Sequence, residues 1–299
     1  MTVHSPLAVP ILVAAVCVSV GTADVVVEVV SPDRFSWEPA DQPHHCFGGD
    51  SATLKLRIFG SAGDRIDLAG QLFQITNRLA VPVGEAFNIS AGAVFDNTAR
   101  LSVTTEVKLP RVERRAVFEL RFLARRGTTD TQRVIGRHRI VGYPPGLLGE
   151  LGKLAEQQPF KLQDPEGRLA AVFDEHEIAY VSVDQADLSR MKLRDRGGSG
   201  KRMRPRHAGL VLCVIPSNDG NDMDGEETDN ITDALLHKGF RVIRFREVAR
   251  TLPSVVFHRF GDQVRVDVEL PLLEVLGANP RAQALLVEIV RRTLAESRP

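Results

Sequence analysis

Short runs with alternating apolar and polar side chains fill the first half of the chain. Such period-two patterns predict strands with one buried face and one wet face. The runs cover residues 52–59, 100–107 and 116–123, with a β-branched run at 25–30 and a last strand at 132–143. Clusters of Gly, Asp and Asn separate them, without a helical period of useful length. Residues 24–143 are therefore predicted to form an immunoglobulin-like β-sandwich.

The pattern changes after Tyr143-Pro144-Pro145-Gly146, where paired prolines end the last strand. Residues 144–157 are predicted to be a linker containing a short helix, and residues 158–299 an α/β domain of the flavodoxin-like class. Helices are expected at 167–176, 227–238 and 279–295, strands at 177–183, 209–216 and 240–245, and a hairpin at 255–260 with 263–269. The run at 209–216 is continuously apolar, which is typical of a central parallel strand.

The N-terminus carries an apolar stretch at residues 7–20, followed by the small residues Gly21-Thr22-Ala23. This order is typical of a secretory signal peptide, and residues 1–23 are predicted to be one. The stretch is too short to span a bilayer comfortably. Its n-region holds His4 but no Lys or Arg, so an uncleaved anchor and a buried strand remain as alternatives. The mature protein is expected to be periplasmic or extracellular.

The composition indicates which classes of partner the protein is expected to have. The 299 residues are 43% hydrophobic, and 38 Lys and Arg balance 38 Asp and Glu. This balance favours neither a nucleic-acid partner nor a membrane partner. Cys46 and Cys213 remain after signal removal, and they form no CxxC pair or zinc pattern. A disulfide between them is one alternative, although the sequence does not bring them close.

The second half resembles the class I glutamine-amidotransferase-like domains that follow immunoglobulin-like modules in exported bacterial proteins. The resemblance rests on three pieces, at residues 235–243, 257–264 and 270–282, and covers roughly 150–295. It implies a fold rather than an activity. A working amidotransferase needs a cysteine on a tight elbow, with a histidine and glutamate to activate it.

The residues depart from that pattern. Cys213 lies inside an apolar run, and no Gly-x-Cys-x-Gly or Gly-x-Ser-x-Gly occurs. His258 has Phe260 two residues on, where the family has an acid. The sequence therefore predicts no catalytic residues and favours a protein without enzymatic activity.

An acidic loop at residues 219–227 follows the apolar run at its carboxyl end, where open α/β sheets bind ligands. Asp219, Asn221, Asp222 and Asp224 are its candidate ligand-binding residues. The three carboxylates offer oxygen ligands to Ca²⁺ or Mg²⁺, and the sequence suggests no other cofactor. The alternative is a solvated loop that places Glu226 and Glu227 in the first turn of a helix.

Four further features of the sequence each have a simple structural explanation beside a functional one. The eight Lys and Arg residues of 190–206 suit a flexible basic loop, or a polyanion or glycan site. Asp174, Glu175, His176 and Glu177 are adjacent in sequence and so point in different directions. His44-His45-Cys46 is predicted to be a loop between strands rather than a metal site, and Trp37 is expected to be a packing residue rather than a sugar platform.

Together these features predict an exported, non-catalytic binding or structural protein whose partner is a protein or glycan at the cell surface. The alternatives are a carbohydrate-active hydrolase or its accessory subunit, and a divalent-cation-binding module.

Cleavage after Ala23 is the first testable expectation. Expression of the full-length chain in a bacterium should give a periplasmic protein whose N-terminus is Asp24, as read by intact mass and N-terminal sequencing. Replacing Ala23 with Arg should block processing, because signal peptidase needs a small residue there. Recovery of the unaltered chain with its first 23 residues attached would favour the anchor or the buried strand.

Overall fold

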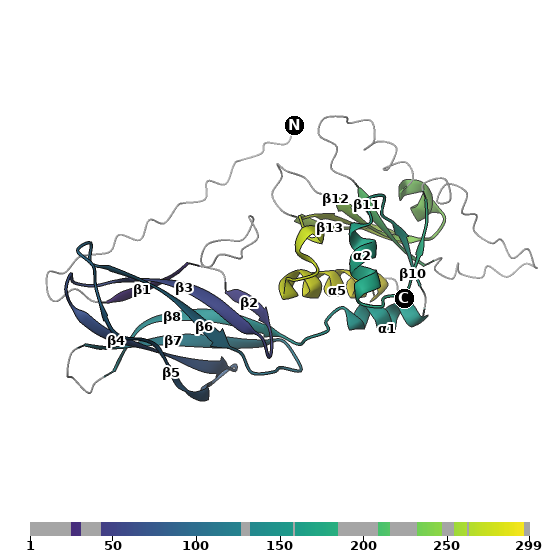
Figure 1. The fold of residues 1–299 in the computed structure, drawn as a ribbon. Helices are drawn as coiled ribbons and strands as arrows, with labels where there is room; N and C mark the ends of the chain where they lie inside the picture. The colour runs from purple at the N-terminus through teal and green to yellow at the C-terminus, as the bar shows by residue number, and fades with distance from the viewer. Residues whose placement is uncertain are drawn as a thin grey trace, which may run out of the picture.

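The computed structural model describes residues 25–30, 43–126, 132–157, 159–184, 209–215, 232–246, 254–261 and 263–295. Within these ranges the chain is a β-rich protein with three sheets, arranged in two parts that lie side by side (Figure 1). Strands of residues 25–143 make the first part, here called the sandwich. Residues 149–295 make the second, here called the α/β part.

The sandwich contains eight strands in two sheets. One sheet has the order β1-β3-β6 and the other β2-β8-β7-β4-β5. All pairings are antiparallel except that of β2 with β8. The strands are β1 (Val26–Val30), β2 (His44–Phe47), β3 (Ser51–Phe59), β4 (Arg65–Ile75), β5 (Ala80–Val94), β6 (Arg100–Lys108), β7 (Ala116–Arg126) and β8 (Arg133–Tyr143).

Side chains from both sheets meet in one core. On β3 the alternation is strict, so that Leu54, Leu56 and Ile58 are buried while the residues between them face solvent. Across the sandwich they share a cluster with Phe118 and Phe122 of β7. The period-two pattern of the sequence therefore marks the inner face, as expected for a sheet with one wet side.

Three strands of the sandwich were not foreseen. β2 occupies residues predicted to be a loop, and that prediction was wrong: the segment is a four-residue edge strand paired with the end of β8. Such a strand is too short to show an alternation. β4 contains Ala69-Gly70, and its pairing with β5 shifts register three times. β5 is exposed or half-buried throughout, so the sequence gives it no clear buried face.

The α/β part is built on a six-stranded sheet with the order β10-β9-β11-β12-β14-β13. Its strands are parallel except β13, which pairs antiparallel with β14 at one edge. The elements are α1 (Gly149–Gln157), β9 (Phe160–Gln163), α2 (Arg168–Glu175), β10 (Tyr180–Ser182), β11 (Leu210–Ile215), β12 (Arg241–Arg246), β13 (Ser254–Phe260), β14 (Gln263–Glu269), the 3₁₀ turn η1 (Leu273–Val275) and α5 (Pro280–Ala295). Residues 232–237 are also helical.

The apolar run predicted to be a central strand is β11, and all six of its residues are buried. Leu210, Leu212 and Val214 belong to the main cluster with residues of α1, α2 and α5. Val211 and Cys213 face the other way, toward Leu235 and Leu236 of the helix at 232–237. Because both faces are covered, the strand carries no polar alternation. The strand expected at 240–245 is confirmed as β12, and the expected hairpin is confirmed as β13 and β14. The sequence did not predict β9.

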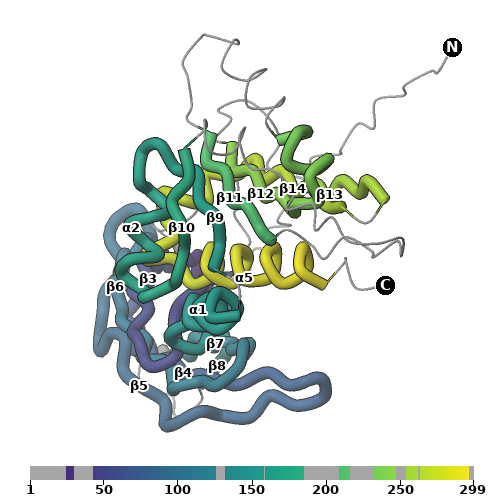
Figure 2. Tube along the Cα trace, turned by 90° about the vertical axis from the view of Figure 1, so that its right-hand side faces the viewer, coloured from purple at the N-terminus to yellow at the C-terminus, as the bar shows by residue number. Residues whose placement is uncertain are grey.

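Helix α5 links the two parts (Figure 2). It lies against the six-stranded sheet on one side and faces the sandwich on the other. Val141 and Tyr143 of β8 form a small apolar cluster with Leu147, which precedes α1. Phe47 of β2 and Ala284 of α5 pack against this cluster. Pro144 and Pro145 therefore connect Tyr143 to Leu147 within this cluster.

Replacing Phe118 with Ala tests the sandwich core. Its side chain is fully buried, so we expect a loss of about 4 kcal/mol in the free energy of unfolding, from lost transfer energy and the cavity left behind. Chemical denaturation measures this. Val134→Ala, at an exposed position of β8, is the control and should change stability by less than about 0.5 kcal/mol. Equal effects of the two changes would contradict the described packing.

Candidate functional site

The four acidic-loop residues predicted to bind a ligand lie outside the described residues. Asp219, Asn221, Asp222 and Asp224 therefore remain a prediction, as do the basic loop of 190–206 and Trp37. In the ranges that the structure does describe, no group of three or more His, Cys, Asp or Glu is placed to hold a metal ion.

Cys213 lies in the middle of β11 and is buried. Burial raises the pKa of its thiol to about 12, so the thiolate that nucleophilic catalysis requires is not formed near neutral pH. Burial, helped by the Asp50 carboxylate, likewise raises the pKa of Cys46 to about 12. Both thiols are free. Cys46 belongs to the core of the sandwich and Cys213 to that of the α/β part, which leaves them in separate cores.

The cluster at residues 174–177 ends helix α2. Asp174 and Glu175 are in its last turn, His176 is the C-cap, and Glu177 takes a positive φ of 54°. The backbone turns at the end of α2, so these four side chains do not converge on one point.

His258 has an acidic partner that the sequence pattern missed. Its Nε2 lies 2.9 Å from Oδ2 of Asp267, on the neighbouring strand β14. Oδ1 of the same carboxylate accepts a hydrogen bond of 2.6 Å from Nε of Arg244, and Arg265 lies 3.2 Å from Oδ2. Asp267 is thus shared by three cationic or basic side chains, which makes it a structural anchor of the sheet. A local motif could not reveal it, because the partner is on another strand.

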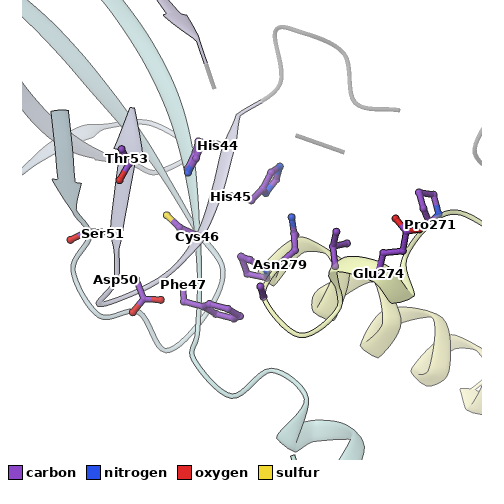
Figure 3. Close-up of a pocket in the computed structure, with 13 residues that line it drawn as sticks. His44, His45, Cys46, Phe47, Asp50, Ser51, Thr53, Pro271, Glu274 and Asn279 are labelled. Carbon is purple, nitrogen blue, oxygen red and sulfur yellow. The ribbon is translucent and has the colours of Figure 1, made fainter. Parts of the chain in front are cut away.

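A set of polar side chains converges where the sandwich meets the α/β part (Figure 3). A pocket of about 740 Å³, here called the junction pocket, is open between β2 and the segment that precedes α5. This volume is in the usual range for small-molecule sites. Its lining residues are His44, His45, Cys46, Phe47, Asp50, Ser51, Thr53, Pro271, Glu274, Val275, Ala278, Asn279 and Pro280.

Strand geometry divides β2 between the pocket and the core. Consecutive side chains of a strand point to opposite sides. His45 and Phe47 therefore point toward the segment before α5, whereas the sulfur of Cys46 points toward the sandwich (Figure 3). Of the His44-His45-Cys46 group, the structure directs only His45 at the α/β part. This arrangement excludes the three residues as a joint ligand set for one ion.

His45 is held in a partly buried, electropositive position. Its Nδ1 lies 3.2 Å from the hydroxyl oxygen of Tyr143, and its Nε2 is buried with no hydrogen-bond partner among the described residues. Burial, followed by the charges of Arg281, His44 and Arg115, lowers the pKa of His45 from its ordinary 6.5 to about 4. The imidazole is therefore neutral at physiological pH.

The opposite wall is fixed by the start of α5. Asn279 caps this helix, since its Oδ1 accepts hydrogen bonds from the backbone amides of Arg281 and Ala282, at 2.9 and 3.1 Å. Pro280 follows as the first helical residue, where its missing amide hydrogen costs nothing. The cap and the 3₁₀ turn η1 hold Glu274 and Asn279 in the pocket wall. The chemistry of the site is thus mixed, with carboxylates, hydroxyls, an amide and a neutral imidazole.

Acid should destabilise the fold through His45. Its folded pKa lies below the unfolded value, so the stability gained from keeping it neutral is present above pH 6.5 and is lost as the pH falls toward 4. Allowing for partial exposure, we expect a loss of about 2 kcal/mol over that range. His45→Gln should remove this part of the pH dependence in denaturation measured at several pH values, and His237→Gln, at an exposed position, should not. An unchanged pH profile for His45→Gln would contradict the assigned environment.

Among the described residues, no helix combines the length and the apolar character that a bilayer crossing needs.

Comparison with known proteins gives no family for the chain. No protein-family model and no curated protein matches it. Solved structures match only loosely. The sporulation control protein Spo0M from Bacillus subtilis has 10% identity and a TM-score of 0.30, over 47% of this chain and 57% of its own. A Niemann-Pick type C2 protein from the Japanese carpenter ant has 9% identity and a TM-score of 0.27, over 42% of this chain and 98% of its own. At these TM-scores the likenesses carry no argument.

Proposed function

We propose that this chain is an exported, non-catalytic binding protein in which an immunoglobulin-like sandwich carries a degenerate, flavodoxin-like amidotransferase-type domain. The ligand is a small polar molecule held in the junction pocket. The observation that carries this proposal is a pocket of ligand size that is lined by His45, whose buried Nε2 has no hydrogen-bond partner among the described residues. An unpaired buried polar atom is costly, and a ligand that pairs it recovers that cost.

The lining of the pocket indicates the ligand's charge. Asp50 and Glu274 contribute negative charge, while Arg281, Arg115 and His44 surround His45 with positive charge. Neither sign dominates, so the pocket suits a neutral molecule with several hydrogen-bonding groups. Hydroxyl groups from Ser51 and Thr53 and the amide of Asn279 extend the same chemistry.

Binding is favoured over nucleophilic catalysis because Cys213 is inaccessible. It sits within β11 rather than on an elbow, and its thiol pKa is about 12. The family's mechanism needs an exposed, activated cysteine.

The hydrolase alternative rests on Asp50 and Glu274, which bring one carboxylate from each part to the same pocket. Glycoside hydrolysis needs one carboxyl that burial keeps protonated near neutral pH. Both residues are exposed, so neither has the surroundings of a general acid. This exposure favours recognition of hydroxyl groups over bond cleavage.

The test is ligand binding to the full-length chain. A panel of neutral saccharides, polyols and amino acids is screened by thermal shift, and positives are titrated by calorimetry. We expect one chemical class to raise the Tm, since a ligand that binds the folded state stabilises it. Glu274→Gln should weaken that compound about tenfold, the cost of one charged hydrogen bond.

Glu85→Gln is the matched control, because this carboxylate is equally exposed but lies on β5, away from the pocket. It should leave affinity unchanged. The proposal fails if no compound binds at millimolar concentration, or if the bound compound is indifferent to both Glu274 and His45.

A further inference from the structure

A second cavity lies between the sandwich and the α/β part, with a volume of about 500 Å³. Two arginines line it, so it is here called the arginine pocket. It shares no lining residue with the junction pocket, and its volume is within the usual range for small-molecule sites. The arginine pocket is therefore a separate candidate site with its own chemistry.

The two arginines come from the two parts of the molecule. Arg115 directly precedes the pairing of Ala116 with Gly142, which brings it to the end of β8, where Tyr143 also lines the cavity. Arg281 comes from α5. Beside burial, the charges of Arg281 and Arg115 lower the pKa of His45, so both guanidiniums lie near this one side chain. Positive charge is thus concentrated at the end of the cavity where the sandwich meets α5.

The place of Arg281 in its helix adds to this charge. The first turn of α5 contains Arg281 and no acidic residue, although the positive end of a helix dipole favours carboxylates there. A guanidinium has five N–H donors, so a ligand can share it with the contacts that Arg281 already makes in the protein. An anion bound at this end would be stabilised by both guanidiniums and by the helix dipole.

One acid among the described residues, Glu288 of α5, also lines the cavity. It follows Arg281 by seven residues, which corresponds to two helical turns and about 10 Å along the axis. Glu288 is exposed, and solvent and salt screen such a charge over that distance. The arginine end therefore keeps its positive character.

The other polar groups of the lining are already engaged. Oγ of Ser254 donates a hydrogen bond of 2.9 Å to Oε2 of Glu269. The hydroxyl oxygen of Tyr143 lies 3.2 Å from Nδ1 of His45. The guanidiniums are therefore the groups that remain to hold the charged end of a ligand.

The rest of the wall is apolar. Leu270 belongs to the core of the α/β part, and Val255 and Leu285 pack against that core. These side chains keep their positions without a ligand, so they offer a preformed apolar surface. A cationic end beside such a surface matches a molecule that has one negative group and an apolar body.

We propose that the arginine pocket binds a monocarboxylate with a short apolar body. Arg115 and Arg281 hold the carboxylate, and Val255, Leu270 and Leu285 cover the body. A guanidinium matches the planar carboxylate with two parallel N–H···O hydrogen bonds, which a point charge such as lysine cannot form. This proposal does not depend on the ligand of the junction pocket, and the failure of either one leaves the other standing.

Calorimetry with hexanoate tests the ligand class on the full-length chain at neutral pH and physiological salt. Hexanoate should bind at millimolar concentration or below. Hexanamide has the same body without the charge and should bind at least about tenfold more weakly, because it cannot form the charged hydrogen bonds. Inorganic phosphate should also bind more weakly, since it gains nothing from the apolar wall. No binding of hexanoate at millimolar concentration, equal binding of hexanamide, or tighter binding of phosphate would overturn the proposal.

Variants then place the carboxylate in the cavity. Arg115→Gln should weaken hexanoate binding about tenfold, the effect of one charged hydrogen bond. Arg114→Gln is the matched control, because Arg114 is also exposed and carries the same charge but does not line the cavity. It should change the affinity by less than about twofold, since salt screens exposed charges. Equal weakening by the two variants, at an unchanged Tm, would show a general charge effect and would contradict the site.

Discussion

The pairing of β2 with the end of β8 is the constraint on which the junction depends. It aligns His45 with Val141 and Phe47 with Tyr143, and so sets a short edge strand directly against α5. Without this ladder, neither the packing of Phe47 in the small apolar cluster at the junction nor the β2 wall of the junction pocket would form. Four residue pairs thus determine how the two parts of the molecule meet.

The same contact explains why His45 is neutral. A charged imidazole there would be partly removed from water and would face Arg281 and Arg115. Both effects disfavour the proton, and together they keep the imidazole neutral in the wall of the pocket. The neutral state of His45 is therefore a consequence of packing at the junction.

Sequence reasoning recovered the elements that have a strong period and missed those that do not. β3, β6 and β7 alternate because one face is wet, and β11 is uniformly apolar because both faces are covered. β2 and β9 are four residues long, too short for any period. The junction pocket could not be predicted from the sequence for another reason: His45 and Glu274 are far apart in the chain, and only the tertiary fold brings them to the same pocket.

Asp267 shows how a single charge organises the far edge of the α/β part. Arg244 is only 8% exposed, and a guanidinium so deeply placed is tolerated because a carboxylate lies 2.6 Å away. The same carboxylate holds His258 on the edge strand, so burial at β12 and order at β13 depend on one side chain. The ordinary reading of a histidine–aspartate pair is catalytic, but here both carboxylate oxygens are already engaged by arginines. The arrangement therefore favours rigidity of this edge of the sheet over catalysis.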